Sequence, residues 1–256
     1  MHEIGDPTEL PGTDTISDAR LHALDWPREL APVLIEGCEF SEVRFRECDL
    51  EGVEIKDCRF IACTFSDSIL MDATFERCSL FTPSAESNRG ADQSVCRFTN
   101  CDLRRSRWTG CDLSLAEFPG SRLHGVRLER CQAQGADFSR ADFSWQVSRK
   151  MILSDVEMLD TNLAYANLTG AYLANASLRG SRLSHADLSQ AHLEGADLRD
   201  TELHQVILTR AVLRDADLRD AQLDSIDPRS TDLVGVKLKE WQLKALVIPL
   251  GIKLEP

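Results

Sequence analysis

The sequence lacks the features that usually mark a membrane protein, a secreted protein or an enzyme. No apolar run approaches the roughly 18 residues that a membrane span requires. The first residues carry neither the basic stretch nor the apolar stretch of a secretory signal. No glycine-rich phosphate loop is present. These absences predict a cytoplasmic bacterial protein that has no membrane partner, no cofactor and no small-molecule substrate.

The histidines give no support to catalysis or to metal binding. None of them has a Ser, Cys or carboxylate partner at a spacing that marks a nucleophile or a metal site. We therefore expect no enzymatic activity. Two lie near the N-terminus and four fall at outward or corner positions of the repeat described next: His2, His22, His124, His185, His192 and His204.

A five-residue period runs through most of the chain. It resumes at Phe98 after a first interruption and continues, with few exceptions, to Leu238. A small residue usually stands two places before each centre of the repeat, as Ala166 does before Leu168. The centres before the interruption are Phe40, Phe45, Leu50, Ile55, Phe60, Phe65, Leu70, Phe75 and Leu80.

This period excludes ordinary helices and flat strands. Five residues of an α-helix turn a side chain about 140° past its predecessor, so the centres would form no apolar stripe. In a flat strand an odd repeat would place successive centres on opposite faces. A short extended stretch followed by a corner in every pentapeptide keeps all centres on the same side. The repeat therefore predicts an all-β solenoid whose coils pair like strands.

The cysteines fit this interpretation without disulfides or metal. Each one lies two residues before a centre, a position that Ala, Ser, Thr or Val occupies elsewhere, and no Cys-x-x-Cys pair exists. We expect them to be small buried residues with free thiols, as suits a reducing compartment. They are Cys38, Cys48, Cys58, Cys63, Cys78, Cys96, Cys101, Cys111 and Cys131.

The repeat resembles that of the pentapeptide-repeat family, which reads roughly Ala-Asp/Asn-Leu-x-x. The resemblance implies a right-handed quadrilateral β-helix, and the recurrence of residues 196–200 as 216–220 agrees with four pentapeptides per coil. We expect this β-helix over residues 37–238. Residues 1–36 are then an acidic N-terminal extension, in which a short helix from Ser17 to Trp26 would cover the first coil.

Two segments interrupt the repeat and predict projecting loops. Residues 81–95 have loop composition, and the spacing from Leu80 to Phe98 is not a multiple of five. Residues 144–152 lack a centre between Phe143 and Leu153. Loops on a rigid scaffold often carry function, although tolerated insertions are the alternative.

The C-terminal segment, residues 239–256, leaves the repeat. Lys239 to Val247 is expected to form a short helix that ends before Pro249. Its apolar surface is larger than an end cap needs, which favours a two-fold homodimer contact. The residues expected in this dimer interface are Trp241, Leu246, Val247, Leu250 and Ile252.

Three segments are similar to those of the Qnr-type (quinolone-resistance) members of the family. They are residues 131–138, which read Cys-Gln-Ala-Gln-Gly-Ala-Asp-Phe, residues 161–167, and residues 232–252. The resemblance covers about residues 36–254. It implies an acidic dimeric rod shaped like B-form DNA, which binds a type II topoisomerase (DNA gyrase or topoisomerase IV) and protects it from quinolones or other poisons. Such a mimic would itself bind no nucleic acid.

Charge and loops suggest where this partner would bind. The formal net charge is −13. If residues 144–152 do not shift the phase of the repeat, every twentieth outward residue forms one acidic face: Glu117, Asp137, Glu157, Asp197 and Asp217. A general requirement for solubility is the alternative explanation. The loops would supply specificity through Arg89, Asp92, Trp145, Arg149, Lys150 and Met151.

Two other functions remain open beside topoisomerase protection as antibiotic resistance. An immunity factor against a topoisomerase-directed natural product would share the mechanism, and neighbouring genes would identify it. A generic pentapeptide-repeat scaffold would bind a different protein partner and would leave gyrase unaffected.

Overall fold

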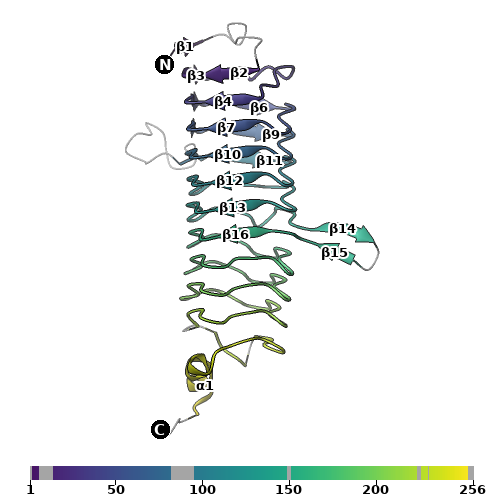
Figure 1. The fold of residues 1–256 in the computed structure, drawn as a ribbon, viewed down its shortest axis with the longest axis vertical. Helices are drawn as coiled ribbons and strands as arrows, with labels where there is room; N and C mark the ends of the chain where they lie inside the picture. Colours follow the sequence, from purple (N-terminus) through teal and green to yellow (C-terminus); the bar gives the residue numbers. More distant parts are fainter. Residues whose placement is uncertain are drawn as a thin grey trace.

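The chain forms one elongated β-solenoid, with its N-terminal residues at one end and a short helix at the other (Figure 1). The computed structural model describes residues 2–5, 14–81, 95–148, 151–223, 226–229 and 231–252. Successive coils are joined by parallel ladders, as in the pairing of Phe75 with Ile55 on one side and Trp108 on the other. The predicted all-β solenoid is confirmed.

The ladders define four faces, which we number in the order in which the chain visits them. Face 1 contains β1 (His2–Ile4), β3 (Ala19–His22), β5 (Glu39–Ser41) and β8 (Arg59–Ile61). Face 2 contains β6 (Arg44–Arg46), β9 (Thr64–Ser66) and β11 (Arg97–Thr99). Isolated bridges extend both faces toward the C-terminus.

Face 3 consists of isolated bridges, which join Asp49, Ile69, Asp102, Arg122 and Asp142 in one run and Tyr172, His192, Val212 and Asp232 in another. Face 4 carries the seven-stranded sheet of β2 (Thr15–Ser17), β4 (Leu34–Glu36), β7 (Glu54–Lys56), β10 (Thr74–Glu76), β12 (Arg107–Thr109), β13 (Arg127–Glu129) and β16 (Glu157–Leu159). Bridges continue this sheet through Ser177, Asp197, Asp217 and Lys237.

The centres and the small residues before them fill the interior, as the sequence predicts. On face 2 the rings of successive coils stack nearly parallel, with centroids 4.3 Å apart for Phe45 and Phe65 and 4.5 Å apart for Phe65 and Phe98. Trp108 stacks on Phe75 at 3.6 Å and is 1% exposed. Burial of this apolar column is the main source of the stability of the rod.

All nine cysteines are buried and carry free thiols, which confirms their predicted role. Their thiols donate weak hydrogen bonds to main-chain carbonyls, for example from Cys131 Sγ to the carbonyl oxygen of Trp108. Burial raises the pKa of the Cys101 thiol to about 12. A thiol with a raised pKa is unreactive at neutral pH, so Cys101 acts as a core side chain.

The N-terminal boundary expected at residue 36 is wrong, and so is the helix expected from Ser17 to Trp26. These residues form β2 and β3, whose side chains Ile16 and Leu21 are buried. Ile16, Leu21 and Trp26 are five residues apart, so the repeat already begins there. The solenoid therefore includes this segment, and β1 pairs in parallel with β3 beyond it.

The C-terminal end is closed by the predicted short helix. It begins as η3 (Glu240–Gln242), continues as α1 (Leu243–Val247) and ends with η4 (Ile248–Leu250). Gln242 is buried and donates through Nε2 to the carbonyls of Leu218 and Ala221, both at 2.8 Å. Its Oε1 accepts from the main-chain nitrogen of Lys239 at 2.9 Å. One side chain thereby satisfies polar groups that an open coil would leave unpaired.

Candidate interaction site

The second interruption of the repeat is a β-hairpin that projects from the edge between face 3 and face 4 (Figure 1). It consists of β14 (Trp145–Ser148) and β15 (Met151–Leu153), which pair antiparallel. Leu153, expected as a core centre, belongs to β15 and is only half-buried. The hairpin places fifteen positions instead of five between the buried centres Phe143 and Met158.

The hairpin carries four exposed apolar side chains close together in the sequence, whereas the coils expose individual ones such as Leu115, Tyr165 and Ile207. Trp145 is 53% exposed and Met151 52%, and both were expected from the sequence to lie in an interaction site. Val147 at 48% and Ile152 at 42% were missed. The alternation of Trp145, Gln146, Val147 and Ser148 is typical of a strand and could have revealed them. A projecting apolar group of this kind is typical of a protein-binding surface.

The root of the hairpin is built around His124. This side chain was expected at the surface, but Trp145 covers it with ring centroids 5.2 Å apart, and His124 is only 7% exposed. Its Nε2 lies 4.0 Å from the carboxylate of Asp155. His124 Nδ1 and Ser154 Oγ are buried and have no hydrogen-bond partner in the described part of the chain. The hairpin therefore emerges beside two unsatisfied polar atoms.

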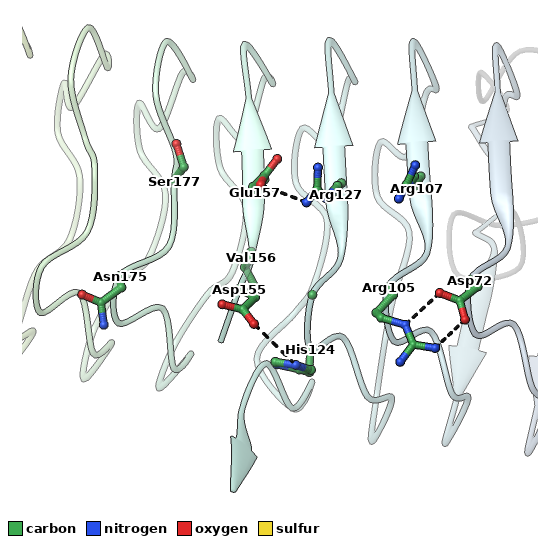
Figure 2. Close-up of a pocket in the computed structure, with 11 residues that line it drawn as sticks. Asp72, Arg105, Arg107, His124, Arg127, Asp155, Val156, Glu157, Asn175 and Ser177 are labelled. Carbon is green, nitrogen blue, oxygen red and sulfur yellow. Dashed lines mark hydrogen bonds and ion pairs between the residues drawn. The ribbon is translucent and has the colours of Figure 1, made fainter. Parts of the chain in front are cut away.

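A hollow of about 420 Å³ lies beside this root (Figure 2). Its lining is mostly polar and comes from face 4 and from the edge between faces 3 and 4. The lining residues are Asp72, Arg105, Arg107, His124, Gly125, Arg127, Asp155, Val156, Glu157, Asn175 and Ser177. Arg105, Arg107 and Arg127 were not among the residues expected in a site. The spacing of twenty between Arg107 and Arg127 is the signal that would have placed them side by side.

The expected single acidic face does not exist. Glu117 and Asp137 are paired on face 2, whereas Glu157 leads through Ser177 to Asp197 and Asp217 on face 4. The ten extra residues of the hairpin equal two pentapeptides, so they shift the phase by half a coil. The two groups of acids consequently lie on opposite faces of the rod.

Most of these acids also form ion pairs. Glu117 pairs with Arg97 at 2.6 Å and Glu157 with Arg127 at 3.3 Å. Hydrogen bonds from Arg199 to Asp197 and from Arg219 to Asp217 lower the pKa of each carboxyl below its usual value. Asp137 makes no ion pair within the described ranges. Much of the negative charge is therefore compensated locally.

The remaining loop residues lie outside the described residues: Arg89, Asp92, Arg149 and Lys150. The flanks of the first loop are nevertheless placed by the ladders. Ser79 belongs to face 1 and Arg97 to face 2, so the chain leaves and re-enters the solenoid at the edge between these faces. This edge is diagonally opposite the one from which the hairpin projects.

The C-terminal segment exposes part of the expected dimer interface. Trp241, Leu250 and Ile252 are exposed, and Val247 is half-buried. Leu246 does not fit the expectation, because it is buried in the core of its own chain. Leu243 and Ile248 of this segment are exposed apolar residues that were not expected in the interface, and Val234 in the coil before it is exposed as well.

Two other kinds of site have no candidate among the described residues. Among the residues that the structure describes, no three His, Cys, Asp or Glu side chains gather where they could hold a metal ion. No helix in the described ranges is both long enough and apolar enough to cross a membrane.

Comparison with known proteins accounts for the repeat. Models of pentapeptide repeats match residues 35–81, 96–132, 116–144, 157–200 and 196–239, more than half of the chain. The chain belongs to the pentapeptide-repeat family. The matched segments leave out residues 82–95 and 145–156, where the first loop and the hairpin interrupt the family repeat.

Within the family the chain is of the Qnr type. It is 30% identical over 86 residues to the pentapeptide repeat protein QnrB4 of Escherichia coli, a match that covers 34% of this chain and 40% of QnrB4. A quinolone resistance pentapeptide repeat protein, QnrB96 of Scandinavium goeteborgense, is 28% identical over 34% of this chain and 41% of its own length. The matched segment thus spans less than half of these curated relatives.

Solved structures extend the likeness to nearly the whole chain. Trypsin-treated QnrB1, described as a plasmid-mediated fluoroquinolone resistance protein, gives a TM-score of 0.71 at 27% identity and covers 93% of this chain and 99% of its own. Full-length QnrB1 gives a TM-score of 0.66 at 26% identity, covering 94% of this chain and 100% of its own. HetL from Nostoc, at 21% identity, a TM-score of 0.51 and coverages of 94% and 92%, shares the fold alone.

Proposed function

We propose that this protein binds a type II topoisomerase, DNA gyrase or topoisomerase IV, and protects it from quinolones or other poisons. The observation that carries the proposal is the likeness to QnrB1, which covers almost all of both chains at 27% identity. The names of QnrB1 and QnrB96 describe resistance to this class of drug. The structure adds a rigid rod with one projecting apolar hairpin, a surface suited to a specific protein partner.

Two parts of the surface would contribute differently to this binding. The hairpin residues Trp145, Val147, Met151 and Ile152 differ chemically from the repeated coils, so they would give specificity. The acids of faces 2 and 4 would supply attraction to a basic channel. A DNA duplex is negatively charged on all sides, so acids on two opposite faces suit mimicry of DNA inside a protein that surrounds the rod.

We further propose that the protein is a homodimer joined through its C-terminal segment. Trp241, Leu250 and Ile252 are exposed at the end of the rod, where a second copy could bury them. Sedimentation of the full-length protein should give a dimer at micromolar concentration. A Trp241→Asp variant should dissociate, because it would bury a carboxylate at the interface. A full-length monomer would contradict this part of the proposal.

A supercoiling assay tests the main proposal. Purified gyrase inhibited by a quinolone should regain supercoiling activity when the protein is added, and the added protein should have no effect on relaxed DNA alone. The matched control is a variant in which residues 145–152 are replaced by a short glycine-serine linker. If the unaltered protein leaves both gyrase and topoisomerase IV inhibited, the proposal is wrong and a scaffold for another partner takes its place.

A further inference from the structure

The hollow beside the hairpin is formed by two parallel rows of side chains that run along the rod (Figure 2). On face 4 the ladder places Arg107, Arg127, Glu157 and Ser177 in successive coils. The neighbouring edge carries Asp72, Arg105, Gly125, Asp155 and Asn175. Gly125 has a φ of 69°, and a Cβ at this position would lie 3.2 Å from Cγ of Arg105, so the stem of Arg105 packs over this glycine.

Among the described residues, Arg107 is the arginine of the lining that makes no ion pair, although its charge helps to lower the pKa of Asp72 and the carboxylate of Asp155 lines the same hollow. In the register of β12 and β13 Arg107 lies directly opposite Arg127, another arginine. Arg127 has Glu157 at 3.3 Å, and Arg105 donates two hydrogen bonds to Asp72 at 2.8 and 2.5 Å. No ion pair involves Arg107 in the described part of the chain. Like charges on directly opposed residues destabilise a sheet, so this arrangement costs stability in the isolated protein.

The other end of the hollow also lacks hydrogen-bond partners. His124 is nine-tenths buried and lines the hollow, and its Nδ1 has no partner among the described residues. A buried polar atom without a partner costs about 1–3 kcal/mol, and such atoms usually bind a ligand or water. The hollow thus combines an unpaired guanidinium with an unsatisfied imidazole nitrogen.

We propose that this hollow binds an oxyanion, a phosphate or a carboxylate, with Arg107 as its principal ligand. The planar guanidinium offers two parallel donors that match the geometry of either anion. Arg105 and Arg127 are held in place by Asp72 and Glu157, which offset their charges, so Arg107 is left as the arginine available to the anion. The anion supplies the negative charge that the register of β12 and β13 leaves out.

The anion has two possible sources that share this chemistry. One is free phosphate. The other is a carboxylate side chain of the partner protein that binds the hairpin. This second source depends on the proposed function. The hollow adjoins the hairpin root through His124, so a partner seated on Trp145 would bring its own surface over Arg107.

The first experiment compares thermal unfolding of the isolated protein with that of Arg107→Gln, at low ionic strength. Arg107→Gln should unfold at a higher temperature than the wild type, because the substitution removes the opposed charges. Millimolar inorganic phosphate, added at constant ionic strength, should raise the Tm of the wild type and not that of Arg107→Gln. Arg46→Gln is the matched control, since Arg46 is also an exposed strand arginine without an ion pair in the described residues. It should keep the full response to phosphate.

The second experiment measures the affinity of the same three proteins for gyrase in phosphate-free buffer. If the anion is a carboxylate of the partner, Arg107→Gln should weaken binding about tenfold or more, whereas Arg46→Gln should not. If the anion is free phosphate alone, only the Tm response should depend on Arg107. A wild-type protein that ignores gyrase refutes the proposed function but leaves the phosphate test valid. The oxyanion site is refuted if Arg107→Gln lowers the Tm, or if neither phosphate response nor gyrase affinity depends on Arg107.

Discussion

The coils of the solenoid and the hairpin that projects from them use apolar residues in opposite ways. In the coils, the apolar side chains at the centres of the repeat point inward, and most are almost fully buried, as Trp108 is at 1% exposure. In the hairpin, Trp145 is 53% exposed, and every residue of β14 faces solvent. The two tryptophans belong to the same chain, but only the first contributes to a core.

This contrast separates stability from recognition within one chain. A coil gains stability from its neighbours on both sides, and its outer surface repeats the same chemistry in every turn. The strands of the hairpin pair only with each other, so its side chains, apart from the Trp145 ring that packs on His124, are free to match a partner. Substitutions in the coils should therefore change the free energy of unfolding, and those in the hairpin should change binding.

The largest difference is expected between the alanine variants of the two tryptophans. Trp108→Ala should destabilise the fold by about 3–5 kcal/mol, because it removes a large buried ring and leaves a cavity. Trp145→Ala should change the free energy of unfolding by less than about 0.5 kcal/mol. Denaturant unfolding followed by circular dichroism measures both. Similar losses in the two variants would show that the hairpin is part of the cooperative core.

A smaller effect is expected at the C-terminal end of the rod. Gln242→Ala should cost about 2–3 kcal/mol, because buried main-chain groups such as the carbonyls of Leu218 and Ala221 lose their partner. Lys244→Ala, an exposed position in α1, is the control and should be nearly neutral. Hydrogen exchange should show faster opening of the last coils in the first variant only. Unchanged protection would mean that the helix itself, without Gln242, closes the end.

The hairpin should dominate the effect on binding. Joint substitution of Trp145 and Met151 by alanine should weaken binding to gyrase about tenfold or more, which corresponds to about 1.4 kcal/mol. The Tm should not change, since both side chains are largely exposed. The affinity would be measured by titrating the variant over surface-bound gyrase. Full protection of gyrase by this variant would mark the hairpin as a passive insertion.

The smallest effect concerns the ion pairs on face 4. The pKa values of Asp197 and Asp217 lie below the usual 3.8, so the folded state favours the ionised form. The stability that these pairs provide is present above that pH and is lost as the pH falls below it. Because both carboxylates are partly exposed, the change should stay under about 1 kcal/mol. The test compares the free energy of unfolding of the wild type with that of Asp197→Asn as the pH is lowered. The advantage of the wild type should shrink below pH 3.8, and an advantage that grows there would contradict the prediction.

Several features could be predicted from the sequence because they depend only on local spacing. The positions of Phe45, Phe65 and Phe98 in the core and the free thiols follow from the five-residue period alone. The same period, traced back through Ile16 and Leu21, would also have placed the N-terminal coils. A helix was expected there because the irregular spacing between Trp26 and Ile35 hid the repeat.

The acidic face could not be predicted in this way, because it depends on how the chain is threaded through space. Glu117 and Glu157 are forty residues apart, which equals two full coils only if no residue leaves the solenoid. The hairpin removes ten residues from the count, and so the two carboxylates lie on opposite faces. Nothing in the spacing itself says whether an interruption bulges outward or continues the coil.

The sequence by itself determined that this chain is an all-β solenoid with a closed apolar interior. A short repeat leaves only one arrangement that buries every centre, and each pentapeptide carries that information locally. Only the tertiary structure decided which surface residues become neighbours. The burial of His124 under Trp145 depends on the path of the hairpin, and the opposition of the two groups of acids depends on the phase between distant coils. That phase is set by the length and path of the insertions, because each residue that leaves the solenoid rotates all later positions around its axis.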